Sequence, residues 1–145
     1  MTIEEKTLDY LMKHIPCNPP EIGGIMGGIQ EIIKYIQIDV GIQQKCGCRY
    51  QPNTYILNKI IKEWSNNSIE FYGIFHTHFY GIETLSEGDK QYINKILLSM
   101  PNTIEKLYFP IIVIPEYKCI PYCAIRYKDT VLIKKEILKI KKENM

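Results

Sequence analysis

The sequence predicts an α/β or α+β domain with a central mixed β-sheet flanked by helices. Segments with helical periodicity alternate with segments of strand character along the chain. The apolar run at residues 107–115 is typical of a buried central strand. A chain of 145 residues is long enough for one domain with a substantial core, and no repeat or linker marks a boundary. We therefore expect a single domain over residues 1–145.

The first half of the chain contains two predicted helices and two predicted strands. They are recognised by the spacing of apolar residues and by the prolines and glycines between them. They are predicted, in order, as a helix over residues 3–15, strands over 21–30 and 31–40, and a helix over 52–64. Residues 41–51 are expected to form a loop.

The second half is predicted to contain further strands around one helix. The predicted strands cover residues 69–75, 107–115, 120–127 and 131–140, and the predicted helix runs from Ser86 to Met100. Pro110 suggests that one side of its strand is free or bulged, because proline cannot donate a ladder hydrogen bond. The last segment, residues 131–140, could equally be a helix, since its apolar spacing is ambiguous.

The first predicted strand is rich in glycine. Glycines at this density weaken a strand unless another backbone or a ligand must come close. Their spacing fits neither a dinucleotide-binding fingerprint nor a P-loop. Glu21 stands just before them and is either an exposed loop carboxylate or part of a site. The glycines are Gly23, Gly24, Gly27 and Gly28.

Composition narrows the classes of function. The net charge of +2 is too small to indicate nucleic acid or a membrane surface as the main partner. The N-terminal residues lack the apolar segment of a secretory signal, and no apolar run reaches the length of a transmembrane helix. The five cysteines are therefore expected to be reduced thiols in a cytoplasmic protein. The oligomeric state is left open.

One pattern carries metal-binding chemistry: H-x-H-x7-S-x2-D, formed by His76, His78, Ser86 and Asp89. Side chains alternate along a strand, so the two histidines can direct their imidazoles to one point. Asp89 falls in the first turn of the following helix. Two imidazoles and one carboxylate are typical of a catalytic zinc site with an open fourth position. Ser86 and Asp89 also match a helix capping box, which needs no metal.

A zinc hydrolase also needs a general base. Zinc lowers the pKa of bound water from about 15.7 to roughly 7, and a carboxylate must then move the proton to the leaving group. Glu21 is the best candidate, because the glycines after it would let its strand lie close beside the histidine strand. Glu83 and Glu87 are nearer in sequence, but are expected on the loop and the helix surface. The hydroxyl of Ser86 could donate to a developing oxyanion or only cap the helix.

Two patterns combine these residues, namely Glu21-x-x-Gly24-Ile-Met-x-Gly28 and, far downstream, Gly73-x-x-His76-x-His78-x7-Ser86-x2-Asp89. Together they resemble the JAMM (MPN+) zinc metallopeptidase family of the small prokaryotic type. The resemblance spans roughly residues 3–127.

This resemblance implies a cytidine-deaminase-like three-layer sandwich. It also implies a zinc-dependent metallopeptidase or isopeptidase acting on the C-terminal tail of a small ubiquitin-like or sulfur-carrier protein. By the same resemblance His76, His78 and Asp89 are zinc ligands, Glu21 is the acid/base, and Ser86 positions or stabilises the tetrahedral intermediate.

The chain departs from the family pattern at three places. Thr77 stands where the family usually has serine, and Phe79 and Leu85 stand where it usually has proline. None of these removes a ligand. These three departures are expected to change the shape of the loop that follows the histidines, and hence the choice of substrate.

Three other interpretations of the sequence compete with this one. Cys46-x-Cys48 and Cys119-x3-Cys123 could form a four-cysteine zinc cluster if their loops met, although neither has the usual spacing. Cys17 has no assigned role. A zinc nucleoside deaminase is disfavoured because its H-x-E and P-C-x-x-C signature is absent from the sequence. A catalytically silent scaffold that binds a protein partner would typically lose the ligands that this chain keeps.

Overall fold

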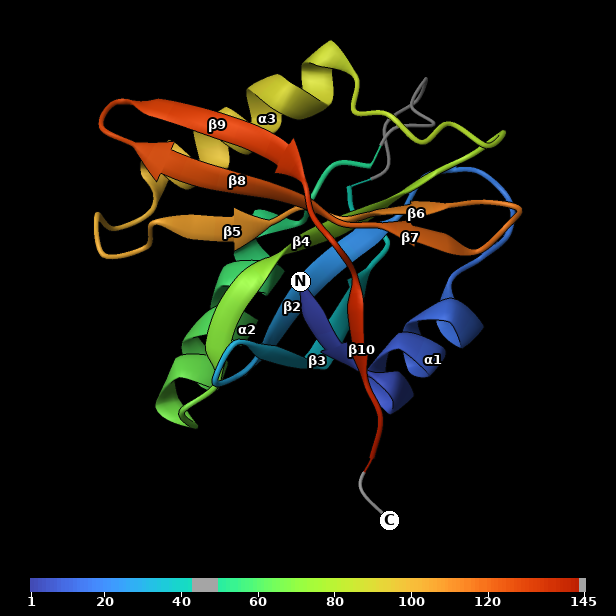
Figure 1. The fold of residues 1–145 in the computed structure, drawn as a ribbon, viewed down its shortest axis with the longest axis horizontal. Helices are drawn as coiled ribbons and strands as arrows, with labels where there is room; N and C mark the ends of the chain where they lie inside the picture. Colours follow the sequence, from blue (N-terminus) through green and yellow to red (C-terminus); the bar gives the residue numbers. More distant parts are fainter. Residues whose placement is uncertain (43–49, 144–145) are drawn as a thin grey trace.

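The computed structural model describes residues 1–42 and 50–143 of the chain. Figure 1 shows a strongly twisted sheet with helices packed around it. In chain order the elements are β1 (Thr2–Glu4), α1 (Glu5–His14), β2 (Gly23–Ile29), β3 (Ile32–Asp39), α2 (Thr54–Asn66), β4 (Glu70–His78), α3 (Glu87–Ser99), β5 (Lys106–Tyr108), β6 (Ile111–Val113), β7 (Lys118–Ile120), β8 (Tyr122–Tyr127), β9 (Thr130–Lys135) and β10 (Lys139–Lys141).

The sheet is mixed, as predicted. Its main path runs β10-β1-β3-β2-β4-β5-β8-β9, and β6 joins it by pairing with β4 while β7 pairs with β6. Strand β2 is antiparallel to both of its neighbours, β3 and β4. Strand β4 is parallel to β5 and β6. The strand that carries both histidines therefore lies in the interior of the sheet, paired on both sides.

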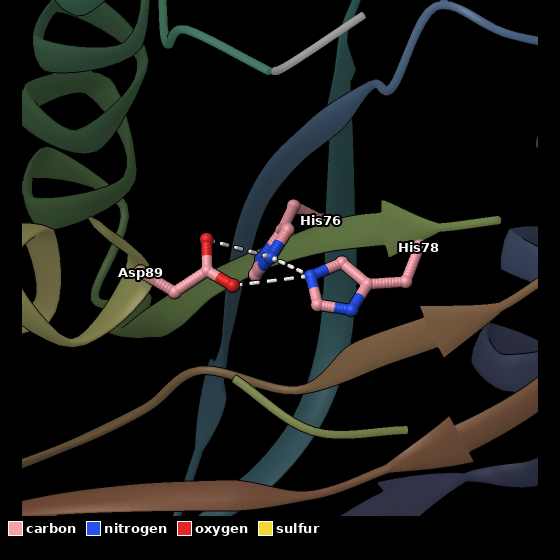
Figure 2. Close-up of side chains that lie close together, drawn as sticks. All are labelled: His76, His78 and Asp89. Carbon is pink, nitrogen blue, oxygen red and sulfur yellow. Dashed lines mark hydrogen bonds and ion pairs between the residues drawn. The ribbon is translucent and has the colours of Figure 1, made fainter. Parts of the chain in front are cut away.

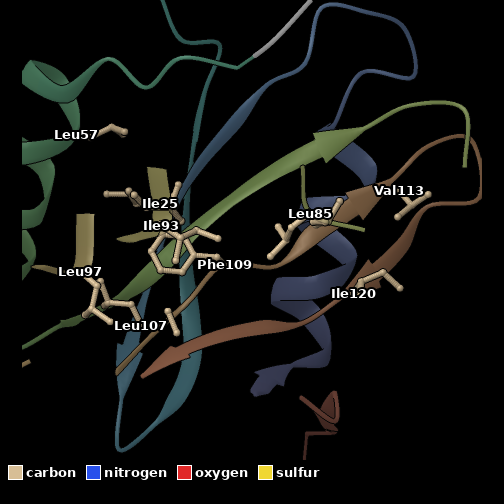
Figure 3. Close-up of a cluster of buried hydrophobic side chains, with 12 residues drawn as sticks. Ile25, Leu57, Leu85, Ile93, Leu97, Leu107, Phe109, Val113 and Ile120 are labelled. Atoms are coloured by element: carbon tan, nitrogen blue, oxygen red, sulfur yellow. The ribbon is translucent and has the colours of Figure 1, made fainter. Parts of the chain in front are cut away.

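Two apolar clusters cover the two faces of the sheet and confirm the predicted layers. On one face Leu11 and Ile15, from α1 and its C-cap, pack with Ile33 and Phe75. On the other face Leu57 of α2 and the buried residues of α3 pack against side chains of β2, β4 and β5, as Figure 3 shows. The result is a helix–sheet–helix sandwich.

Two predicted strands are each divided in two, and the structure decides between the two alternatives for a third segment. The run predicted as one strand over residues 107–115 is two strands, β5 and β6, because Phe109 and Pro110 interrupt the ladder. The segment over residues 120–127 is likewise divided at Pro121 into β7 and β8. Residues 131–140 contain β9 and part of β10, so the strand alternative was right and the helix alternative wrong.

The N-terminal segment was predicted as helix from residue 3, but its first residues form β1 between β3 and β10. Three residues are too few to show a strand period in sequence, and this strand exists only through its neighbours. The loop expected over residues 41–51 lies mostly outside the described residues.

The glycine-rich strand β2 allows the close approach that the sequence predicted. A Cβ atom at Gly24 would lie 2.1 Å from the carbonyl oxygen of Gln37 and 2.8 Å from the ring of Phe75. On the same strand Gly23 is the register partner of His76. Because these glycines have no side chains, β2 can lie close to both β3 and β4 at the end of the sheet that carries the histidines.

Candidate metal centre

His76 and His78 project from the end of β4 toward one point (Figure 2). Their Nε2 atoms are 2.9 Å apart. Thr77 between them faces the opposite way and is fully buried, where its backbone N–H donates to the carbonyl oxygen of Ile22. The alternation of a regular strand thus produces the predicted convergence of the two imidazoles.

Asp89 completes the group from the first turn of α3. Its backbone N–H donates to Oγ of Ser86 at 3.0 Å, and the backbone N–H of Ser86 donates to Oδ2 of Asp89 at 2.9 Å. This reciprocal pair is the capping box that the sequence allowed. The same carboxylate has Oδ1 at 3.4 Å from Nε2 of His76 and Oδ2 at 3.1 Å from Nε2 of His78. The capping box and the candidate metal site therefore share the same residue, Asp89.

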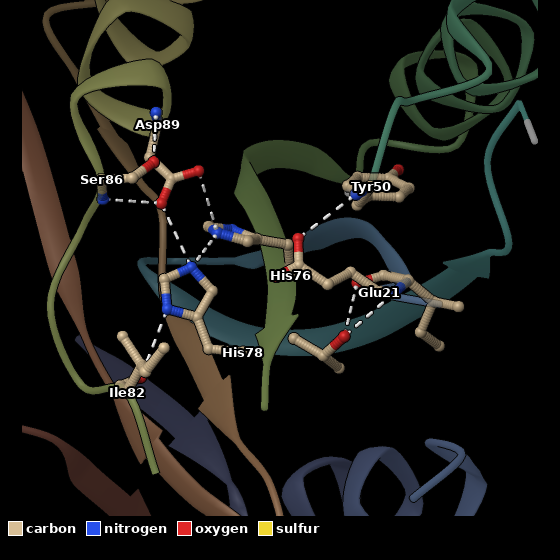
Figure 4. A network of polar contacts seen from close by, with 9 residues as sticks. Glu21, Tyr50, His76, His78, Ile82, Ser86 and Asp89 are labelled. Atoms are coloured by element: carbon tan, nitrogen blue, oxygen red, sulfur yellow. Dashed lines mark hydrogen bonds and ion pairs between the residues drawn. The ribbon is translucent and has the colours of Figure 1, made fainter. Parts of the chain in front are cut away.

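The donor set fits a small divalent cation. Nδ1 of His78 lies 3.2 Å from the carbonyl oxygen of Ile82 (Figure 4). A carbonyl can only accept, so Nδ1 carries the proton in the neutral imidazole and Nε2 turns its lone pair toward the other two residues. The three ligand atoms lie within 4.8 Å of one another.

The ligand spacing agrees with zinc. Tetrahedral zinc with bonds of about 2.0–2.2 Å places its ligand atoms about 3.3–3.6 Å apart. The two Nε2 atoms are 2.9 Å apart and lie 3.4 Å and 3.1 Å from two different oxygens of Asp89, so the group is slightly tighter than a tetrahedral zinc site and of similar size. Within residues 1–42 and 50–143, His76, His78 and Asp89 are the one group of His, Cys, Asp or Glu side chains that could hold a metal.

The electrostatics of the group favour an ionised carboxylate. Burial raises the pKa of Asp89, but its contacts with His76 and His78 outweigh burial and hold that pKa well below its usual range. Burial lowers the pKa of His78, and the hydrogen bond and charge of Asp89 outweigh that effect, so the pKa of His78 is raised. A negative oxygen beside two imidazoles is what a cation requires.

Glu21 reaches the same region from the segment before β2. Its neighbour Ile22 is tied to β4, because its backbone N–H donates to Oγ1 of Thr77 at 3.0 Å. The backbone N–H of Tyr50 donates to Oε1 of Glu21 at 3.3 Å (Figure 4). Burial raises the pKa of Glu21, and the charge of His76 and the Tyr50 hydrogen bond partly offset this. Glu21 is therefore a half-buried carboxylate beside the candidate metal ligands.

A cleft of about 420 Å³ connects these groups. It lies between α3 and the segment before α2, above β4. Its lining comprises Glu21, Tyr50, Gln51, Pro52, Ile74, His76, Gly88, Asp89, Gln91, Tyr92, Ile93, Lys95 and Phe109.

The two competing carboxylates lie elsewhere. Glu83 pairs with Lys118 at 2.7 Å on the surface, and Glu87 pairs with Lys90 at 3.5 Å. Neither lines the cleft. Among the carboxylates considered from the sequence as general base, Glu21 is the one that lines the cleft.

The sequence did not single out Asp39, which organises the segment around Glu21. Its carboxylate accepts hydrogen bonds from the Tyr50 hydroxyl at 2.8 Å and from the backbone N–H groups of Gly41 and Asn53 at 3.0 and 2.9 Å. An acidic residue at the end of a strand gives no sequence signal for such a role. The arrangement depends on residues that the fold brings together.

The departures from the family pattern have structural roles. Phe79 and Leu85 are buried, at 8% exposure each, and pack into the two apolar clusters. Tyr80 and Ile82 between them are exposed. The loop after the histidines is thus held at both ends by core packing.

The four-cysteine alternative depends on Cys46 and Cys48, which lie outside the described residues. Cys119 and Cys123 are free thiols in β7 and β8, and Cys17 is exposed. No described helix is long and apolar enough to cross a membrane.

Comparisons with known proteins show the fold. No protein-family model and no curated protein matches the sequence. The solution structure of protein DSY2949 from Desulfitobacterium hafniense superposes with a TM-score of 0.67 at 19% identity, covering 98% of this chain and 93% of that one. The crystal structure of AF2198, a JAB1/MPN domain protein from Archaeoglobus fulgidus, superposes with a TM-score of 0.55 at 14% identity, covering 97% of this chain and 98% of that one. The chain therefore has an MPN-like fold.

Proposed function

We propose that this MPN-like chain is a JAMM-type zinc metallopeptidase or isopeptidase that hydrolyses an amide bond at the C-terminal tail of a small ubiquitin-like or sulfur-carrier protein. The observation that carries the proposal is that Glu21, His76 and Asp89 line one cleft, and that His78 meets His76 and Asp89 directly beside it. Structural scaffolds have no need of such a group.

The donor set predicts how the chemistry is divided. Zinc held by the two Nε2 atoms and the Asp89 carboxylate would supply Lewis acidity and lower the pKa of a water molecule to roughly 7. Glu21 takes the proton of that water on its carboxylate and returns it to the leaving nitrogen. Its raised pKa suits this exchange, because a general base works best when its pKa approaches the working pH.

Ser86 has two roles in the proposal. Its Oγ accepts from the backbone N–H of Asp89, which uses a lone pair and leaves the hydroxyl proton free to donate. Ser86 is exposed and is not a lining residue of the cleft, but it lies in the same helical turn as Gly88 and Asp89, which are. We propose that its proton stabilises the negative charge that develops on the substrate carbonyl oxygen. Ser86→Ala removes the acceptor and the donor, whereas Ser86→Asp keeps the capping acceptor and removes the donor. A lowered kcat in both variants, with zinc content unchanged, supports the assignment. If kcat in Ser86→Asp equals that of the wild type, Ser86 acts only as the N-cap of α3.

The proposed substrate follows from the size of the chain and the form of the site. An amide must reach a metal group that is itself mostly buried, with side-chain exposures of 14%, 8% and 13% for His76, His78 and Asp89. A flexible extended tail can enter such a cleft, whereas a folded surface cannot. The 145-residue chain has little room for long insertions that would grip a large folded partner.

The test uses purified protein loaded with zinc. We expect about one zinc per chain by metal analysis. Incubation with ubiquitin-like proteins carrying C-terminal extensions should release the extension, which mass spectrometry detects. Glu21→Gln is the matched control and should keep the zinc while losing turnover. Zinc binding without cleavage of any tail would overturn the substrate assignment. Absence of zinc after supply would overturn the enzyme assignment in favour of a silent MPN-type scaffold.

A further inference from the structure

The cleft beside the metal ligands is larger than the activation of water requires. Its volume of about 420 Å³ lies in the range of roughly 300–1,000 Å³ that ligand pockets occupy. Ile74 and Phe109, themselves buried, contribute to its lining, and Tyr50, Pro52 and Tyr92 add further apolar surface. This surface is continuous with Glu21, and the proposed proton transfer does not use it.

One face of α3 supplies a long side of the cleft. Gly88, Gln91, Tyr92 and Lys95 follow one another at the i, i+3, i+4 and i+7 spacing of a single helix face, and all four line the cleft. The metal ligand Asp89 lies at the start of the same helix. The cleft therefore begins at the metal group and continues along α3, and glycine leaves its wall without a side chain near that group.

A positive charge stands further along this face. Lys95 lines the cleft and makes no ion pair with any acidic residue of the described chain. It follows Asp89 by six positions, which is about 9 Å along the helix axis. An extended peptide advances about 3.3 Å per residue, so that distance corresponds to about three residues.

Building on the proposed function, we propose that the cleft selects the substrate by two features of its tail. One of the two residues that flank the cleaved amide carries a large apolar side chain, which fills the apolar part of the cleft. An acidic group about three residues further along the tail pairs with Lys95. If glycine replaced the large apolar residue beside the cleaved amide, the apolar walls of the cleft would stay in contact with water. The complex would then lack the favourable free energy of burying that apolar surface.

The test uses two series of fluorescent peptides with zinc-loaded wild-type protein. One series varies the residue before the cleaved amide and the other the residue after it, each through Gly, Ala, Leu and Phe. We expect kcat/KM to rise at least about tenfold from Gly to Leu or Phe in one series, since a single methylene in an apolar pocket changes rates by roughly 10–200-fold. If the peptides are cleaved, a flat profile, or a maximum at Gly, in both series overturns the proposal.

Binding is measured separately, so that this inference and the proposed function can fail independently. Fluorescence anisotropy with zinc-loaded Glu21→Gln needs no turnover. Tighter binding of the Leu or Phe peptide than of the Gly peptide supports the cleft assignment, even if the wild type cleaves no peptide. Equal binding of all peptides overturns it, even if cleavage occurs.

Two variants with matched controls locate the effect. Gly88→Leu adds a side chain to the cleft wall and should lower binding of the Phe peptide, whereas Glu87→Leu places the same side chain on the neighbouring exposed position and should not. Wild-type protein should prefer a peptide with an acidic residue about three positions from the cleaved amide. Lys95→Glu should remove that preference and favour a peptide with lysine at the same position. Lys90→Glu, on the same helix outside the cleft, should keep the original preference. An equal effect of variant and control in either pair overturns the assignment.

Discussion

The backbone N–H of Tyr50 donates a hydrogen bond to Oε1 of Glu21 over 3.3 Å, while the hydroxyl of the same tyrosine donates to Oδ2 of Asp39 over 2.8 Å. A single residue therefore connects the candidate general base to a carboxylate at the end of β3. A Cβ atom at Gly23 would lie 2.4 Å from the ring of Tyr50, so glycine is needed for the ring to lie there. We expect the orientation of Glu21 to depend on this contact.

Tyr50→Phe tests that dependence. The variant keeps the ring and the backbone N–H but leaves the carboxylate of Asp39 without one of its donors, which typically costs about 1–3 kcal/mol of stability. We expect a lower kcat with KM and zinc content nearly unchanged, because phenylalanine keeps the ring on the cleft wall and the lost hydroxyl acts through Asp39 and the segment that holds Glu21. Urea unfolding and steady-state kinetics measure the two effects. Tyr55→Phe, at an exposed position on α2, is the control. A kcat equal to that of the wild type would show that Tyr50 does not position Glu21.

Glu21→Gln should stabilise the metal-free protein near neutral pH. Burial raises the pKa of Glu21 above its ordinary value of 4.5, so the folded state disfavours the charged form. Below the unfolded pKa both side chains are neutral and the two proteins should be equally stable. As pH rises through the folded pKa, the wild type alone loses stability. Urea unfolding at pH 4 and pH 7 with a chelator measures the difference, with Glu63→Gln on the exposed face of α2 as the control. A difference that does not change with pH contradicts the prediction.

Asp89 and Ser86 can be separated by mutation, although they share one capping box. Ser86→Ala should cost about 0.5–2 kcal/mol of stability through loss of the N-cap and should keep zinc bound. Asp89→Asn should lower zinc affinity at least about 100-fold, more than the loss of a typical outer-shell partner. Competition with a chromogenic chelator measures affinity, and thermal unfolding of the metal-free forms measures the cap. Equal zinc affinity in Asp89→Asn and wild type would remove Asp89 from the ligand set.

Gly24→Ala should destabilise the sheet strongly. The added Cβ would meet the carbonyl oxygen of Gln37 at 2.1 Å, and a backbone oxygen paired in a sheet cannot move away cheaply. We expect a loss of about 1–3 kcal/mol or more, as for other overpacked sites. Gly88→Ala, inside α3, should instead gain up to about 1 kcal/mol from helix propensity. Denaturant unfolding compares the two, and unchanged stability in Gly24→Ala would show that β2 and β3 can separate at this point.

The cysteines of β7 and β8, Cys119 and Cys123, should be unreactive. Burial raises the pKa of Cys119 to about 12 and that of Cys123 to about 11, so neither thiol ionises appreciably at pH 8. In a Cys46→Ser/Cys48→Ser background, we expect a thiol reagent to label the exposed Cys17 quickly and the other two only after unfolding. Fast labelling of three thiols in the folded protein contradicts this.

Some of the site could be predicted from sequence because its geometry is local. His76 and His78 converge through the two-residue period of a strand, and Ser86 and Asp89 meet within one helical turn. The same locality made the helices and most strands predictable. Prediction from local patterns failed at β1 and around Pro110, because the three-residue strands there exist only by pairing with distant neighbours.

The sequence alone determined which residues could bind a metal, because residue types and their spacing along the chain are properties of the sequence itself. Tertiary structure decided what surrounds them. Only the packing of β2 against β4 brings Glu21 beside residues that follow it by 55 positions or more, and only the loop before α2 brings Tyr50 between Glu21 and Asp39. The cleft along α3, with Lys95 on its lining, has no sequence signature either. Contacts between distant segments depend on how apolar surfaces pack in three dimensions, and no periodicity along the chain encodes them.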